Sequence, residues 1–189
     1  MELFRTTFTM VSLITLLTAC SSGPQVRSDF DHSANFASYK TFGFVSPLGT
    51  DVDGYSTLIT QRLKAATQRE LEARGYRYSE TNPDLLVNFS ARLENKIDIE
   101  PAMPPPIGYY GYRAAAFYGP WPAYGFQNNV DQYTQGTLNI DLVDAKRKQL
   151  VWEGVAVGRV TSEKLANPAP AIDQAVTEIF AKYAYRAGP

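Results

Sequence analysis

The sequence of 189 residues contains one cysteine, Cys20, and one histidine, His32. A single cysteine rules out a disulfide within the chain, and a zinc site that needs several Cys or His ligands is excluded. A catalytic triad would have to use His32, yet no G-x-S-x-G motif accompanies it, and its neighbours Asp31 and Ser33 are explained equally well by a turn. We therefore predict a protein that is not an enzyme and that carries no metal and no other cofactor.

The sequence also lacks an excess of charge of either sign, because 18 Lys and Arg residues are balanced by 19 Asp and Glu residues. A formal net charge of −1 gives no long-range field that would attract nucleic acid, so no nucleic-acid partner is expected. The sequence DVDG at residues 51–54 lacks the later ligands and the terminal Glu of a calcium loop. We interpret Asp51 as a loop residue and Asp53 as the N-cap of a helix.

The N-terminal residues indicate export. Arg5 precedes an apolar run over residues 10–17, and small Ala19 precedes Cys20, which is typical of a secretory signal peptide over residues 1–19. The sequence Leu-Thr-Ala-Cys at residues 17–20 resembles the bacterial lipobox, and the resemblance implies that Cys20 becomes an acylated N-terminus. Ser21 stands where Asp would favour the inner membrane, so the same resemblance implies anchoring in the outer membrane, facing the periplasm.

Removal of residues 1–19 leaves 170, a length that suits one domain. We expect a flexible lipidated tether over residues 20–28 and a single domain over residues 29–189. Within it, the composition predicts a strand at 39–45 and a helix at 55–74 that is capped by Asp53 and Gly75. Strict alternation predicts a strand at 85–99 whose buried face consists of Leu85, Val87, Phe89, Ala91, Leu93, Ile97 and Ile99.

A hairpin is predicted over residues 132–158, with Ala145, Lys146 and Arg147 at its tip. A three-residue loop pairs Leu142 with Leu150, Ile140 with Trp152 and Leu138 with Gly154. The reverse face of the second strand then carries Val151, Val155 and Val157, which are too apolar to remain in water. The basic tip, residues 146–148, is interpreted as a solvated end that discourages edge pairing.

A last helix is predicted from Pro170, with apolar residues at helical spacing from Ile172 to Tyr183. The order β-α-β-β-β-α predicts an α/β (α+β) two-layer sandwich. Its mixed, mostly antiparallel sheet would have about four strands, with both helices on one face.

Four stretches together resemble one known family: DFDHSANFASYKTF, RELEARGYRY, NPDLLVNF and GTLNIDLVDAKRKQLVWEG. This is a family of Gram-negative envelope lipoproteins with a domain of unknown function, and the similarity covers nearly the whole mature chain. The resemblance implies an envelope lipoprotein and brings no catalytic residues with it.

Residues 101–130, which are rich in Pro, Gly and aromatic rings, are predicted to form a long loop at one end of the sheet. Loops of this length are uncommon, and are usually functional or disordered. Either the rings fold back onto the reverse face of the sheet, or some remain exposed and bind a partner. The candidate binding residues are Tyr109, Tyr110, Tyr112, Arg113, Phe117, Tyr118, Trp121 and Tyr124.

Two functions follow from this pattern. The first is a non-enzymatic outer-membrane lipoprotein that acts as an interaction or structural module of the envelope, with another envelope protein as partner. The second is a periplasmic module that binds a glycan or a lipid through residues 108–126. A hydrolase is the least favoured function, because the sequence offers no motif for one.

Overall fold

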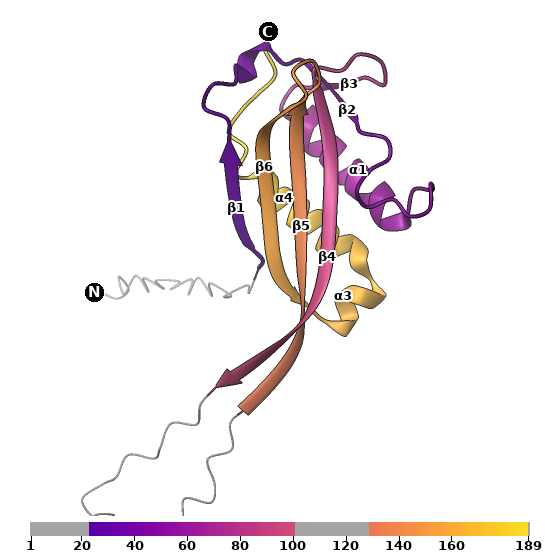
Figure 1. The fold of residues 1–189 in the computed structure, drawn as a ribbon, viewed down its shortest axis with the longest axis vertical. Helices are drawn as coiled ribbons and strands as arrows, with labels where there is room; N and C mark the ends of the chain where they lie inside the picture. Colours follow the sequence, from indigo (N-terminus) through magenta and orange to yellow (C-terminus); the bar gives the residue numbers. More distant parts are fainter. Residues whose placement is uncertain (1–22, 101–128, 189) are drawn as a thin grey trace, which may run out of the picture.

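The computed structural model of the chain describes residues 23–100 and 129–188. These residues form one mixed sheet of six strands in the order β1-β6-β5-β4-β2-β3. Helices α1 and α4 lie against the same face of this sheet (Figure 1). The α+β class and the mostly antiparallel sheet are confirmed. The predicted number of about four strands is wrong, because β1 and the short β3 add one strand at each edge, and a third helix, α3, is present.

Strand β1 (Gln25–Phe30) corrects the predicted tether. It runs antiparallel to β6, with Gln25 opposite Val157 and Phe30 opposite Trp152. Residues 25–28 are therefore part of the sheet, and the folded domain begins before residue 29. Five of the six side chains of β1 are exposed, so no apolar alternation marks the strand in the sequence. Backbone hydrogen bonds to β6 hold it in place instead.

A parallel crossover follows β1. Strand β2 (Thr41–Phe44) runs parallel to β4, and β3 (Arg77–Tyr78) runs parallel to β2. Helix α1 (Leu58–Glu72) connects them and lies within the predicted range. Such crossovers place a helix on one face of the sheet, which is where α1 is found (Figure 1).

The N-cap predicted for α1 is wrong. The Thr57 hydroxyl oxygen accepts a hydrogen bond from the backbone N–H of Thr60 at 3.0 Å, whereas Asp53 lies in a preceding turn at a φ of 48°. The predicted C-terminal signal is confirmed, since Gly75 has a φ of 89°, a value that glycine adopts without steric cost. The N–H of Tyr76 then donates to the carbonyl of Leu71, as in a Schellman motif.

Strands β4 (Leu85–Glu100) and β5 (Asn129–Asp144) pair antiparallel along their full length of 16 residues each. The predicted burial holds for the first part of β4, where Leu85, Val87 and Phe89 are inaccessible to solvent. It is wrong further along. Ala91 is exposed, as are Leu93 and Ile97 at 59% and 63%, and the side chain of Ile99 lies outside the described residues. Beyond the other strands, β4 and β5 continue as a two-stranded arm (Figure 1).

The predicted register between β5 and β6 (Gln149–Val160) is also wrong. Leu142 lies opposite Trp152, Ile140 opposite Gly154 and Leu138 opposite Ala156. The turn has four residues, 145–148, and an irregularity follows Leu142, so the pairing moves by two residues along most of the hairpin. A shift of two preserves the faces of both strands. Ile140 and Leu142 are therefore still buried, as predicted.

The irregularity changes the face of one valine. Val151 is the extra residue of β6 and belongs to the core, although the prediction placed it on the reverse face. Val155 and Val157 do not join the core cluster; Val155 is 1% exposed and Val157 is half-buried. Whether the aromatic stretch covers them lies outside the described residues.

Two helices close the fold. Helix α3 (Ser162–Ala166) was not predicted, and α4 (Pro168–Phe180) begins two residues before the predicted start. Buried residues of α4 pack onto the large rings of the sheet; the ring centroid of Phe180 lies 5.6 Å from that of Trp152. The largest fully buried side chains of the core are Trp152, Tyr76, Phe42, Phe89, Phe180, Leu63, Leu71, Leu85, Ile140, Leu142, Ile179 and Val87.

Candidate functional site

Most of the functional residues predicted from the sequence lie outside the described residues. These are Cys20 and the loop residues Tyr109, Tyr110, Tyr112, Arg113, Phe117, Tyr118, Trp121 and Tyr124. His32 is described, and its ring packs against Phe30 with centroids 4.3 Å apart. The Asp31 carboxylate accepts hydrogen bonds from the backbone N–H and the hydroxyl of Ser33, as the predicted turn requires.

The candidate site in the described residues arises because the long strands extend beyond the shorter helices. Strands β4 and β5 have 16 residues each, about 50 Å at roughly 3.3 Å per residue. Helices α1 and α4 have 15 and 13 residues, which at about 1.5 Å per residue is only about 20 Å. The helices therefore cannot cover the whole face of the sheet. An apolar groove is left open between this part of the sheet and the helices α1, α3 and α4.

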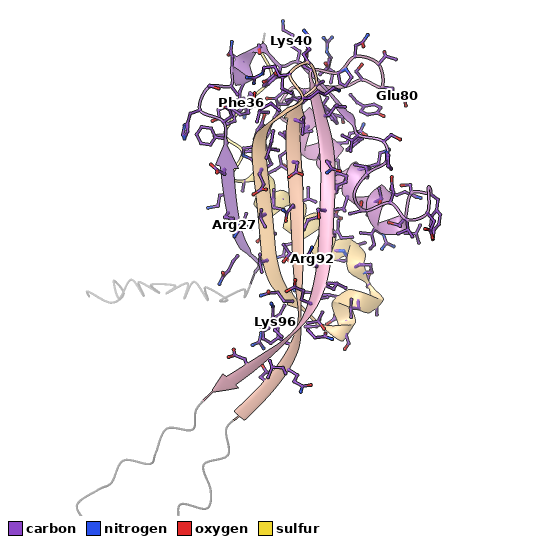
Figure 2. All side chains as sticks on the ribbon, in the orientation of Figure 1. Arg27, Phe36, Lys40, Glu80, Arg92 and Lys96 are labelled. Atoms are coloured by element: carbon purple, nitrogen blue, oxygen red, sulfur yellow. The ribbon has the colours of Figure 1, made fainter. Side chains whose placement is uncertain are left out.

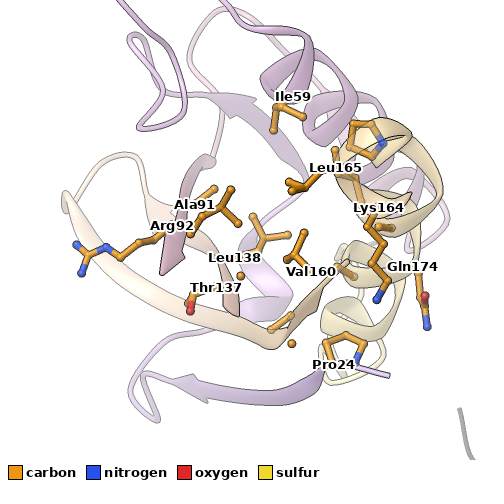
Figure 3. A pocket seen from close by; sticks show the side chains of 18 of the residues that line it. Pro24, Ile59, Ala91, Arg92, Thr137, Leu138, Val160, Lys164, Leu165 and Gln174 are labelled. Carbon is orange, nitrogen blue, oxygen red and sulfur yellow. The ribbon is translucent and has the colours of Figure 1, made fainter. Parts of the chain in front are cut away.

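The groove has a volume of about 390 Å³. In Figure 3 the side chains of Ile59, Leu138, Val160 and Leu165 point toward the same space from α1, β5, β6 and α3. Leu165 is 54% exposed and Leu93 is 59% exposed, so large apolar side chains remain in contact with water there. The full lining is Pro24, Ile59, Leu63, Ala91, Arg92, Leu93, Gly136, Thr137, Leu138, Ala156, Gly158, Arg159, Val160, Lys164, Leu165, Pro168, Ala171, Ile172, Gln174 and Ala175.

Two glycines leave space on the side of the groove that the sheet forms, because they carry no side chain. A Cβ at Gly136 would lie 2.7 Å from Cγ2 of Val160, and a Cβ at Gly158 would lie 3.2 Å from Cβ of Pro24. Pro24 therefore sits directly over Gly158. Because residue 24 immediately precedes β1, the start of the folded chain forms one end of the groove (Figure 3).

The charges at the groove are all positive, since no Asp or Glu is among the described residues that line it. The Lys164 ammonium lies 3.4 Å from the carbonyl oxygen of Arg159. The Arg159 guanidinium is held by Asp131 at 2.7 Å and stacks over the Tyr133 ring at 4.0 Å from its centroid, which braces the base of the arm. Arg92 points away from the groove (Figure 3).

Arg92 and Lys96 lie on the part of β4 that leads into the arm (Figure 2). Both are paired with Glu94, at 3.6 Å and 2.8 Å respectively. These ion pairs are exposed and therefore weak. They keep the strand soluble where its other face carries exposed Leu93.

A second polar cluster has a structural role. The basic tip, residues 146–148, is exposed, as predicted, but Arg147 also has a structural role. Its Nε donates to the Asp144 carboxylate at 2.9 Å, and its terminal nitrogen donates to the Tyr39 hydroxyl at 3.2 Å. Burial by itself would raise the pKa of Asp144. Hydrogen bonds from Arg147, Tyr39 and the N–H of Lys146 outweigh it and lower that pKa to about 2.

Within residues 23–100 and 129–188, no group of three or more His, Cys, Asp or Glu side chains is placed to hold a metal ion. Over the same residues, no helix is long and apolar enough to cross a membrane. The groove is thus the feature of the described chain that most resembles a binding site, since ligand sites are mostly apolar hollows of about 300–1,000 Å³.

The sequence carried one signal for this groove that the prediction did not use. An alternating strand of 15 residues at 85–99 is longer than the predicted helix at 55–74 can cover, because a strand rises about 3.3 Å per residue and a helix about 1.5 Å. Leu93 and Ile97 satisfy the alternation whether or not anything packs on them. The alternation therefore shows which face of the strand is apolar, but it does not show whether another element packs on that face.

Comparison with solved structures places this fold among known ones. A PDZ domain protein from Parabacteroides distasonis is similar with a TM-score of 0.54 and 13% identity; the match covers 86% of this chain and 36% of that protein, so the chain spans about a third of its length. A PelC dodecamer from Paraburkholderia phytofirmans gives a TM-score of 0.47 at 10% identity, over 86% of this chain and 98% of that one. A minor lipoprotein from Acinetobacter baumannii gives 0.40 at 10% identity, over 77% and 92%.

At such identities the similarity concerns the fold alone. No curated protein matches the sequence. Residues 26–184 match the family described as domain of unknown function DUF4136, and this span contains β5, β6, both long helices and all but one of the residues that line the groove. The chain therefore belongs to the DUF4136 family, as its resemblance to a lipoprotein family of unknown function had implied.

Proposed function

We propose that the protein is a non-enzymatic lipoprotein of the outer membrane, anchored through Cys20 and facing the periplasm, and that it is a binding module whose ligand is an acyl chain. The observation that carries this proposal is the open apolar groove between the sheet and the helices. It favours the lipid-binding function among those that the sequence left open. A glycan would require more polar groups than the lining offers.

The chemistry of the lining suits a hydrocarbon chain. Burial of one methylene group contributes about 0.8 kcal/mol, so several methylenes would offset the cost of immobilising a flexible ligand. The exposed Leu93 and Leu165 would be removed from water at the same time. Lys164 at the edge of the groove would attract the carboxylate or phosphate that lipids carry at one end.

The non-enzymatic part of the proposal is supported by the surroundings of the single histidine. The His32 ring packs edge-on against Phe30, and the neighbouring Asp31 carboxylate is engaged by Ser33. His32 does not line the groove. We therefore assign these residues to the turn between β1 and the segment that precedes β2.

The test is a fluorescence titration of the unlipidated mature chain, residues 21–189, with a fluorescent fatty acid. We expect saturable binding that Leu165→Asp weakens at least tenfold, because this change places a carboxylate in the groove. Leu150→Asp is the matched control, since Leu150 is also an exposed leucine, at 46%, and does not line the groove. Absence of saturable binding, or equal losses in both variants, would contradict the proposal.

A further inference from the structure

The described chain begins at the groove. Pro24 lines it, and the preceding Gly23 lies beside α4, where an added Cβ would be 3.2 Å from a carboxylate oxygen of Glu178. Pro24 in turn packs over Gly158 of β6. Gly23 and Pro24, the first described residues, thus lie beside α4 and β6 respectively.

The distance from this point to the predicted lipid anchor is short. Cys20 precedes Pro24 by four residues, which span at most about 14 Å even when fully extended. The pairing of β1 with β6 starts at Gln25, so residues 25–28 cannot lengthen this connection. Any acyl chain on Cys20 is therefore held within reach of the groove.

We propose that one acyl chain carried by Cys20 binds in the groove of the same molecule. This inference rests on the proposed function, since it requires both the acylation of Cys20 and the affinity of the groove for acyl chains. It goes further because it names the source of the chain. The first ligand of the groove is then the protein's own acyl chain, and other lipids bind only in competition with this chain.

Attachment strongly favours the internal chain over a free one. A ligand on a short linker has an effective concentration on the order of millimolar, with no further loss of translational freedom. The groove and the bilayer both remove methylenes from water, at about 0.8 kcal/mol each, so the exchange between them is nearly balanced. In water, without a bilayer, the chain remains in the groove. At a membrane the chain is divided between the groove and the bilayer, so the groove is free for a second lipid in a fraction of the molecules.

The experiment uses the full-length protein in cells that are fed a fatty acid with a terminal diazirine. After irradiation, peptide mass spectrometry locates the crosslinks that the Cys20 acyl chain forms. We expect crosslinks within the same molecule to groove residues such as Leu138, Val160 and Leu165. These crosslinks should increase when the protein is extracted from the membrane into buffer with little detergent.

A matched pair of variants tests the location. Ala91→Trp places a large ring in the groove at an exposed position and should reduce the internal crosslinks at least fivefold. Ser90→Trp is the control, because Ser90 is exposed on the opposite face of the same strand and should leave them unchanged.

The outcomes separate this inference from the proposed function. A labelled protein that crosslinks only to membrane lipids, or that is affected equally by both variants, overturns the inference and leaves the binding of free fatty acids to stand on its own titration. A protein without label overturns the inference together with the lipid anchor. A labelled protein with groove crosslinks that only Ala91→Trp removes supports both.

Discussion

Asp144→Asn should destabilise the fold strongly, although Asp144 is a charged residue and not part of the hydrophobic core. Its carboxylate accepts hydrogen bonds from the Tyr39 hydroxyl, from the backbone N–H groups of Lys146 and Arg147, and from the Arg147 side chain. It joins the hairpin tip to the segment before β2. An amide keeps the shape and removes the charge that these four donors share.

The magnitude follows from the pKa of Asp144. Folding lowers it from 3.8 to about 2, and the side chain is only 11% exposed, so solvent screening is modest. At about 1.36 kcal/mol per pKa unit, the ionised form contributes roughly 2.4 kcal/mol to stability at neutral pH. Because the pKa is lowered in the folded state, this contribution is complete well above pH 3.8. It is about half lost near pH 3 and mostly lost at pH 2.

The assay is urea unfolding followed by circular dichroism, at pH 7 and again near pH 2.5. We expect Asp144→Asn to lower the free energy of unfolding by about 2–3 kcal/mol at pH 7 and by much less at the lower pH. Asp173→Asn is the control, because the ion pair between Asp173 and Arg69 is about half exposed at both partners and should contribute nothing measurable. A loss that is equal at the two pH values would refute the electrostatic reasoning.

Two further changes test the packing and the capping, with the urea midpoint as the measurement. Gly154→Ala should destabilise by about 1–3 kcal/mol, because the added methyl group would overlap Ile179 and Trp152; unchanged stability would mean that α4 does not approach β6 so closely. Thr57→Ala should cost about 1 kcal/mol through loss of the N-cap of α1, while Asp53→Ala should have no such effect; the reverse result would restore the cap predicted from the sequence.

The sequence predicted well those elements whose apolar residues pack against another element of the fold. Helix α4 and the first half of β4 bury Val176, Ile179, Leu85 and Val87 as their spacing requires. Strand β1 was missed because its side chains are mostly exposed and its stability comes from backbone pairing, which leaves no pattern in the residue types. An edge strand of this kind is indistinguishable from a polar tether without its partner.

The register of the β5–β6 hairpin was missed for a different reason. The turn includes a fourth residue, Lys148, at a φ of 55°, and its neighbours are organised by the Asp144 carboxylate. Side-chain matching across the strands cannot detect this, since registers that differ by two residues bury the same face. The groove was missed because the alternation along β4 does not show where the helices lie over the strand.

The pairing of β4 with β5 has a consequence for the modularity of the chain. The pair remains in register as far as Glu100 and Asn129, so these two residues lie opposite each other. The entropic cost of closing a loop grows slowly with its length, by about 0.6 kcal/mol per doubling. The β4–β5 pair itself therefore supplies two neighbouring ends, Glu100 and Asn129, to which a replacement segment of another length would be joined.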